Sequence, residues 1–392
     1  MKKKIPILFF IIIYFNQGFY DLSSQIIYYL TRETWGLSAT LIGLIGFITS
    51  LAWYIKILWG FLIDKFASKK GQIRNLLYIN YISLLLLYSY IIIYGLNFWS
   101  LLITLTLINC FIGCNDVAND SVMVKYEQKY KLQGKLQSVQ WISLGIAGLI
   151  TSLLGAYIAD KFTSELGIRI SYLIVSIVPI ITLLYLRFKW QEPIVSKKKK
   201  ESFKSILKYF KNKQFLLSLL FIACFQLSPS FGTALMIKAR EVLYVDKMFL
   251  GYLGATGTVL GILGYLLYYW KFYNYNLKKL LYFTVIFSAI TNLFYLYIPN
   301  QWYLLGYNIA FGIFSGITFM SILAFFAIII PKGSEGLIYA CVTALSNLCV
   351  KGGSLFGGII YDNLGYNWNV IISSILTFVC IFFISYLKIE KI

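Results

Sequence analysis

Apolar residues along this chain gather in long runs separated by short polar stretches. Twelve such runs can be drawn, at residues 6–30, 38–63, 76–96, 98–124, 136–159, 168–188, 214–239, 248–270, 279–298, 302–330, 337–360 and 369–387. A helix needs roughly 20 apolar residues, at about 1.5 Å each, to cross a hydrocarbon core of about 30 Å. The pattern therefore predicts an all-α membrane protein with twelve transmembrane helices.

The composition agrees with a lipid environment. Of the 392 residues, 59% are hydrophobic and 13% are charged, whereas soluble domains are about a quarter charged. The net charge of +20 resides mainly in short loops between the apolar runs, where Lys and Arg set the membrane orientation. We therefore expect both termini in the cytoplasm, in the cell membrane or alternatively an organelle membrane, and no nucleic-acid partner.

A basic stretch divides the apolar runs into two sets of six. Residues 190–213 carry many lysines and form either an amphipathic helix on the inner leaflet or a charged linker. We expect an N-terminal half at 1–188, a cytoplasmic basic linker at 189–213 and a C-terminal half at 214–392. The two six-helix halves would be pseudo-symmetric.

Sequence echoes six runs apart support related halves. Residues 134–160 align without a gap on residues 336–362, and a Gly-x-x-Gly beginning at Gly43 is matched by one beginning at Gly251. Pairing of run n with run n+6 is typical of a parallel repeat. Chance similarity between glycine-containing helices is the alternative.

Several polar or ionisable residues fall inside apolar runs, where a charge is costly and usually functional. Gln17 and Asp21 stand one helical turn apart in the first run, and Asp116 and Asp120 do so in the fourth. Two carboxylates held close in a low dielectric repel, so one tends to keep its proton, which suits proton coupling or cation binding. The structural alternatives are a hydrogen-bond network between helices for the first pair and capping or salt bridging for the second.

Lys56 is a single lysine within an otherwise apolar second run. Helical rise places it about 27 Å from the outer side, at the depth that Asp116 reaches in the fourth run. An ion pair between Lys56 and a carboxylate of the fourth run is therefore feasible. A water-filled cavity or an anionic substrate is the alternative partner.

A short motif follows the second run. Gly60 and Asp64 form a Gly-x-x-x-Asp, and basic residues that include Lys65 and Arg74 come next. This arrangement resembles the signature of the major facilitator superfamily. The resemblance implies a two-half fold and a role for these four residues in conformational gating.

The fourth and fifth runs carry a more specific pattern. It reads Asp116-Val-Ala-Asn-Asp120-Ser and then Gly134-Lys-Leu-Gln137-Ser-Val-Gln-Trp141. This pattern resembles the folate–biopterin transporter family, and further motifs agree in order over most of the chain. The chain departs from the family where prolines are usual, at Ala52 and Ile57, and muropeptide permeases and acetyl-CoA transporters are the nearest competitors.

The resemblance implies a secondary transporter that moves folate or pterin solutes by alternating access with protons. The candidate substrate-binding or coupling residues are Gln17, Asp21, Lys56, Asp116, Asp120, Gln137, Trp141, Asn347 and Lys351. Trp141 would stack on a pterin ring, and Lys56 or Lys351 would offset the substrate's negative charge. The alternative is a major facilitator carrier for another small solute, such as a sugar, amino acid, peptide or muropeptide fragment.

The sequence does not favour an enzyme. Histidine is absent, the six cysteines lie in apolar runs without metal-ligand spacing, and the chain has no recognisable catalytic constellation. We expect no cofactor, no metal and a monomer. The expected partners are the solute, H⁺ and membrane lipids.

The predicted orientation can be tested by labelling. In a background without the native cysteines, a cysteine at residue 200 should react with an impermeant maleimide only after the membrane is permeabilised, because the basic linker faces the cytoplasm. Labelling of residue 200 in intact cells would reverse the orientation and every depth derived from it.

Overall fold

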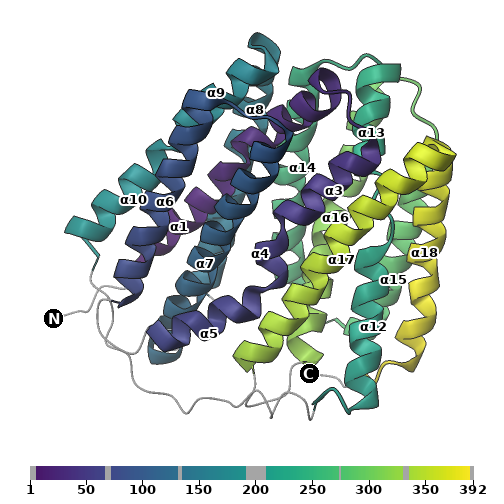
Figure 1. Cartoon of the computed structure of the whole chain (residues 1–392). Helices are drawn as coiled ribbons and strands as arrows, with labels where there is room; N and C mark the ends of the chain where they lie inside the picture. Colours follow the sequence, from purple (N-terminus) through teal and green to yellow (C-terminus); the bar gives the residue numbers. More distant parts are fainter. Residues whose placement is uncertain are drawn as a thin grey trace. The chain divides into compact units, whose positions relative to one another are not determined.

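The computed structural model describes residues 6–66, 72–130, 135–190, 209–272, 275–329 and 335–388. All regular secondary structure in these ranges is helical (Figure 1). Residues 191–208, which make up most of the basic segment between the predicted halves, lie outside the described part.

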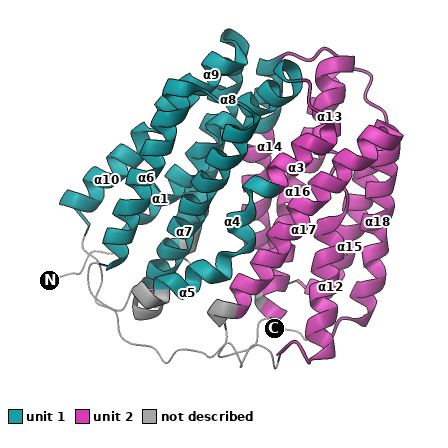
Figure 2. Cartoon of the chain, in the orientation of Figure 1, with its two compact units in different colours: residues 1–35, 48–198, 247–255 teal, residues 36–47, 199–246, 256–392 magenta. Residues whose placement is uncertain are grey.

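The chain divides into two compact units (Figure 2). Unit 1 consists of residues 1–35, 48–198 and 247–255, and unit 2 consists of residues 36–47, 199–246 and 256–392. Each unit contains most of one predicted half, with one short segment from the other half. The division at residues 189–213 stays a prediction.

The helices of unit 1 come mainly from the first six apolar runs. They are α1 (Ile7–Phe19), η1 (Tyr20–Ser23), α2 (Ser24–Tyr29), η2 (Leu30–Thr34), α4 (Leu51–Tyr54), α5 (Lys56–Phe66), α6 (Gln72–Tyr94), α7 (Phe98–Tyr130), α8 (Lys135–Lys161), α9 (Ser164–Val175) and α10 (Ile177–Phe188). α1 packs along α8, and α6 packs on α7, α9 and α10. The interior is partly aromatic, with Tyr81, Tyr88 and Tyr172 buried.

Unit 2 contains most of α3 (Ala39–Thr49) and the helices of the later runs. These are α12 (Lys213–Leu227), α13 (Gly232–Ile237), η3 (Lys238–Val242), α14 (Lys247–Leu267), η4 (Tyr268–Phe272), α15 (Leu277–Phe294), α16 (Gln301–Ile329), α17 (Glu335–Leu364) and α18 (Tyr366–Tyr386). The first residues of α14 belong to unit 1. The core of unit 2 includes an edge-to-face contact of Phe221 with Phe325, whose ring centroids are 5.3 Å apart.

Each of the twelve predicted apolar runs contains helix within the described ranges. Ten helices there are long and apolar enough to cross a membrane, so the predicted count of twelve is not confirmed. The second run is divided into α3, α4 and α5, and α17 is not among the ten. Breaks of this kind are invisible to a hydropathy pattern.

Two spans are interrupted at corresponding places. In unit 1, η1 interrupts the first span, and Gly155 of α8 lies so close that a Cβ would be 3.0 Å from the carbonyl oxygen of Leu22. In unit 2, Gly357 of α17 lies directly against the backbone of Ser230, between α12 and α13. Gly155 and Gly357 are equivalent positions in the sequence echo. The same close backbone contact therefore recurs in both units.

The echo at Gly43 and Gly251 is part of a longer repeat. Residues 31–46 and 239–254 each carry an Arg-Glu pair, followed at the same interval by the Gly-x-x-Gly. Both begin in a π-helical turn, η2 and η3. Both then pass through a residue with positive φ, which is Gly36 at 65° in one copy and Tyr244 at 51° in the other.

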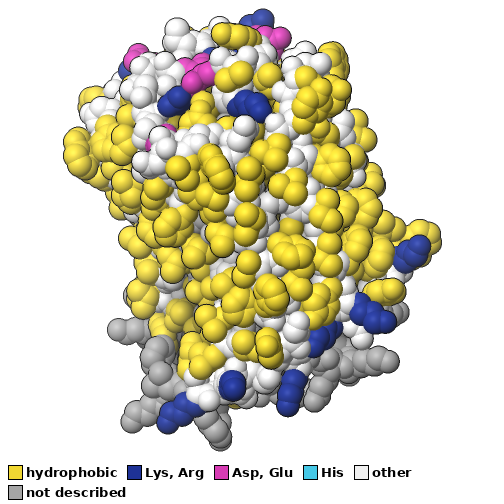
Figure 3. Space-filling view, turned by 90° about the vertical axis from the view of Figure 1, so that its right-hand side faces the viewer, with side chains coloured by type: hydrophobic (Ala, Val, Ile, Leu, Met, Phe, Trp, Pro, Cys, Tyr) yellow, Lys and Arg dark blue, Asp and Glu magenta, His cyan; other side chains and the backbone are white. Residues whose placement is uncertain are grey.

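Apolar side chains cover much of the surface. One face shows a broad band of hydrophobic side chains, with charged side chains beyond its two ends (Figure 3). Leu86, Trp99 and Phe382 are among the many large apolar residues that are exposed. A surface this apolar is suited to lipid and not to water.

The repeated turn gives a stability prediction. Tyr244 is 81% exposed, so Tyr244→Gly loses little packing and removes the steric cost of positive φ. We expect a gain of about 0.5–1 kcal/mol, measured by thermal unfolding in detergent. Gly36→Ala is the matched control: a Cβ there meets nothing within 4 Å, so it should destabilise by about 1 kcal/mol through strain alone. An unchanged or lower midpoint for Tyr244→Gly would contradict this account.

Candidate functional site

Polar side chains from five helices gather inside unit 1. We call this group the polar cluster, and it comprises Tyr14 and Gln17 on α1, Lys56 on α5, Asn80 on α6, Asn115, Asp116, Asn119 and Asp120 on α7, and Gln140 on α8. Polar groups within an apolar helical unit are expensive and are retained for a function or for specific helix packing.

The predicted pair between Lys56 and a carboxylate of the fourth run is present. The Nζ of Lys56 lies 2.5 Å from Oδ2 of Asp116, and their side chains are 16% and 4% exposed. Lys56 is the first residue of α5, directly after the break at Ile55 that separates α5 from α4. In a nearly buried pair at this distance, each charge compensates the other in a low dielectric.

Two tryptophans hold the backbone and side chain around Lys56. The indole ring of Trp53 lies below its ammonium, at 5.5 Å from Nζ to the ring centroid, and the indole N–H of Trp53 donates to Asn109 on α7. The indole N–H of Trp59 donates to the carbonyl oxygen of Ala52 across the break. The break in the second span therefore directs the side chain of Lys56 toward α7.

Asp120 has a different kind of partner. The hydroxyl of Tyr14 donates to Oδ1 of Asp120 over 2.8 Å. Asp120 follows Asp116 by one helical turn, so both carboxylates face the same side of α7. The two acids thus differ in environment, one beside a cation and one beside a neutral donor.

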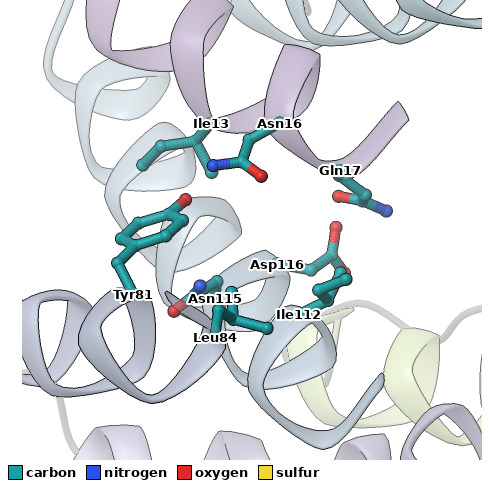
Figure 4. A pocket seen from close by; sticks show the side chains of 8 residues that line it. All are labelled: Ile13, Asn16, Gln17, Tyr81, Leu84, Ile112, Asn115 and Asp116. Atoms are coloured by element: carbon teal, nitrogen blue, oxygen red, sulfur yellow. The ribbon is translucent and has the colours of Figure 1, made fainter. Parts of the chain in front are cut away.

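A small, partly open pocket lies beside Asp116, with room for roughly one water molecule. Figure 4 shows Asn16 and Gln17 of α1 facing Asn115 and Asp116 of α7 across it. Asn115 is fixed by an amide hydrogen bond from Asn80 at 2.8 Å. The buried Oε1 of Gln17 accepts no hydrogen bond from the described residues, which is the situation that an internal water satisfies.

Asp21, which was predicted to stand one helical turn from Gln17, is not part of the polar cluster. It falls in the 3₁₀ turn η1 and is exposed, with the Ser24 hydroxyl at 3.4 Å. The prediction assumed a continuous α-helix. A 3₁₀ turn has about three residues per turn instead of 3.6, so the helical spacing that it used does not hold through η1.

The remaining candidates are spread over both units. Trp141 on α8 is 39% exposed, and in unit 2 Asn347 is partly buried and Lys351 is exposed on α17.

The gating candidates are only partly described. Gly60 is on α5 and has open space around its Cα, and Arg74 is on α6. The backbone of Asp64 and Lys65 lies in α5 and that of Gln137 in α8, while their side chains lie outside the described part.

Five members of the cluster were not among the predicted site residues, namely Tyr14, Asn80, Asn115, Asn119 and Gln140. Asn115 and Asn119 directly precede the two acids of the fourth run. Tyr14 precedes Gln17 by three residues and therefore shares its helical face, so a search for polar and hydroxyl groups one turn from Gln17 would have found it. Asn80 and Gln140 each stand in apolar runs, but which helices they face is not readable from the chain alone.

The fold matches solved membrane transporters. A D-xylose-proton symporter superimposes with a TM-score of 0.73 over 98% of this chain and 97% of that one, at 14% identity. A bacterial homologue of the lysosomal transporter Spinster gives 0.72 over 96% and 94%, also at 14% identity. The chain is therefore an integral, multi-pass, all-α membrane protein with the major facilitator fold.

The BT1 family profile matches residues 17–391, and the chain belongs to this family of folate–biopterin transporters. The "Folate-biopterin transporter" of Synechocystis sp. is 25% identical over 355 residues, which cover 86% of this chain and 70% of that protein. The "Putative folate transporter 2" of Plasmodium berghei is 24% identical over 355 residues, covering 85% and 76%. The predicted family is confirmed, and it is a transporter family, not an enzyme family.

The ion pair gives a stability prediction. Lys56→Gln and Asp116→Asn should each lower the free energy of unfolding by roughly 3 kcal/mol, because each leaves a buried charge without its counter-charge. The double variant should recover a good part of the loss, measured by thermal unfolding in detergent. Lys161→Gln is the control, since its pair with Asp160 is at the surface and should be worth less than about 1 kcal/mol. Strictly additive single and double effects would show that the two charges do not depend on each other.

Proposed function

We propose that this protein moves folate or pterin solutes across a membrane by alternating access, coupled to the movement of protons. The observation that carries the proposal is the polar cluster, which puts one ammonium and two carboxylates inside a unit of a chain from the folate–biopterin transporter family. Buried charges on transmembrane helices are characteristic of substrate and proton pathways.

Recognition of the solute would combine charge and aromatic contact. Folates join a flat pterin ring to carboxylates. Lys56, which forms the ion pair with Asp116, would also attract a substrate carboxylate. Lys351, exposed on α17, is the second candidate cation, and Trp141 offers an exposed indole for stacking on the ring. Gln137 and Asn347 would supply hydrogen bonds, by resemblance to the family.

The coupling residues are assigned from the acids present in the helices, and the gating residues from resemblance to the major facilitator superfamily. Asp21, Asp116 and Asp120 are the acids available for the coupling proton, and Gln17 lies at the cavity beside Asp116. The motif at Gly60, Asp64, Lys65 and Arg74 would act in conformational gating, as in the major facilitator superfamily that it resembles.

The proposed setting is the cell membrane, with both termini in the cytoplasm and the protein a monomer. The distribution of Lys and Arg along the chain supports this orientation. In the face shown in Figure 3, one end of the apolar band carries Lys and Arg without Asp or Glu among its described side chains, in agreement with a cytoplasmic end.

Transport into proteoliposomes tests the proposal. With an acidic exterior, labelled folate or biopterin should accumulate above its external concentration, and a protonophore should abolish the accumulation while leaving exchange of internal for external solute. Protein-free liposomes and a gradient-free sample are the controls. Accumulation of a sugar, amino acid, peptide or muropeptide fragment, with neither folate nor pterin moved, would establish the alternative carrier instead.

A further inference from the structure

We propose that Asp120 is the group that takes up and releases the coupling proton, that Tyr14 is its positioning residue, and that Asp116 with Lys56 is a permanent charge pair. This inference rests on the proposed proton coupling and decides between carboxylates that the sequence left equivalent. The proton would enter from water on one side of the membrane and leave to water on the other, and no other group in the cluster would change its charge.

Asp116 is a poor proton carrier because of Lys56. The ammonium and the carboxylate are 2.5 Å apart and nearly buried. Protonation of Asp116 would leave the ammonium in a low-dielectric site without its counter-charge, which is strongly unfavourable. Asp116 is therefore expected to stay ionised as long as Lys56 remains its partner.

The charge balance of the cluster singles out Asp120. The groups that face Asp120 are Tyr14 from α1, Lys56 from α5, Gln140 from α8 and Asp116 from its own helix. One cation and two ionised acids leave one negative charge uncompensated. Among the described residues Asp120 has no ion pair of its own, so its protonation is the step that makes the cluster neutral.

Tyr14 fixes the carboxyl without compensating its charge. Its hydroxyl donates to Oδ1 over 2.8 Å, which holds the side chain in one orientation and leaves Oδ2 to accept the proton. Tyr14 is 7% exposed and lies on α1, the helix whose Gln17 lines the cavity beside Asp116. Tyr14 thus connects Asp120 to the helix that lines the small pocket beside Asp116.

Buried amides on α7 and α8 provide places for water. Asn119 is 0% exposed and Gln140 is 1% exposed. Both amide atoms of Asn119 and the Nε2 of Gln140 find no hydrogen-bond partner in the described part of the chain. Amides in this state are usually satisfied by ordered water, and a water at Gln140, whose side chain faces Asp120, would bring the proton to Oδ2 of Asp120.

Infrared titration of the purified, reconstituted protein tests the assignment without any substrate. A protonated-carboxyl band that appears as the pH is lowered should be lost in Asp120→Asn and retained in the Lys56→Gln/Asp116→Asn double variant. Asp160→Asn, at an exposed pair with Lys161, controls for removal of any aspartate. Retention of the band in Asp120→Asn, or its loss only when Asp116 is removed, would overturn the assignment.

Tyr14→Phe provides a milder variant that keeps both acids. Loss of a hydrogen bond donated to the ionised carboxylate favours the protonated form, so the midpoint of the band should move to higher pH by about 0.5–1 unit. An unchanged midpoint would remove Tyr14 from the proposal.

Should wild-type protein move neither folate nor pterin while the Asp120 band still titrates, the proposed function fails and the proton site stands. Uptake of folate by a protein in which Asp120 does not titrate would show the reverse.

Discussion

The cost of a bare charge in a low dielectric is the constraint on which the interior of unit 1 depends. Lys56 can be buried because Asp116 lies 2.5 Å away, and it reaches Asp116 because the second span breaks at Ile55. Trp53 and Trp59 tie that break to α7 and to the preceding turn. Around the pair, the amide bond from Asn80 to Asn115 and the hydroxyl bond from Tyr14 to Asp120 satisfy neighbouring polar groups. The cluster is thus organised outward from one ion pair.

Much of the fold follows from period and length. Each apolar run contains helix within the described ranges, although ten and not twelve helices there are long and apolar enough to span a membrane. Helical rise brought Lys56 and Asp116 to one depth, which made their contact feasible, and the structure shows it. Depth says nothing about rotation, however. The partner of Asp120 is Tyr14, one of many aromatic residues in the apolar runs. Asp21 falls in the 3₁₀ turn η1, where regular α-helical spacing does not hold.

The internal repeats also show that helix interruptions are difficult to recognise in the sequence. Gly155 and Gly357, which are equivalent in the echo, each lie against the backbone of an interrupted span. The interruptions themselves left little trace: Ser228-Pro229-Ser230 marks one of them, while the turn at Tyr20–Ser23 has no proline or glycine within it. The π-helical turns η2 and η3 are likewise recognisable only because two copies can be compared.

The contact of Gly155 with Leu22 has a mechanical consequence. A discontinuity in a transmembrane helix is often a hinge, because the backbone there lacks its regular bonds. Here the carbonyl of Leu22 rests on α8 with no side chain between them, so a change of angle at η1 would drive one backbone into the other. This contact therefore restricts bending at η1. We expect α1, η1 and α8 to move as one rigid body during transport, and bending to occur where helices contact each other through side chains that can change conformation.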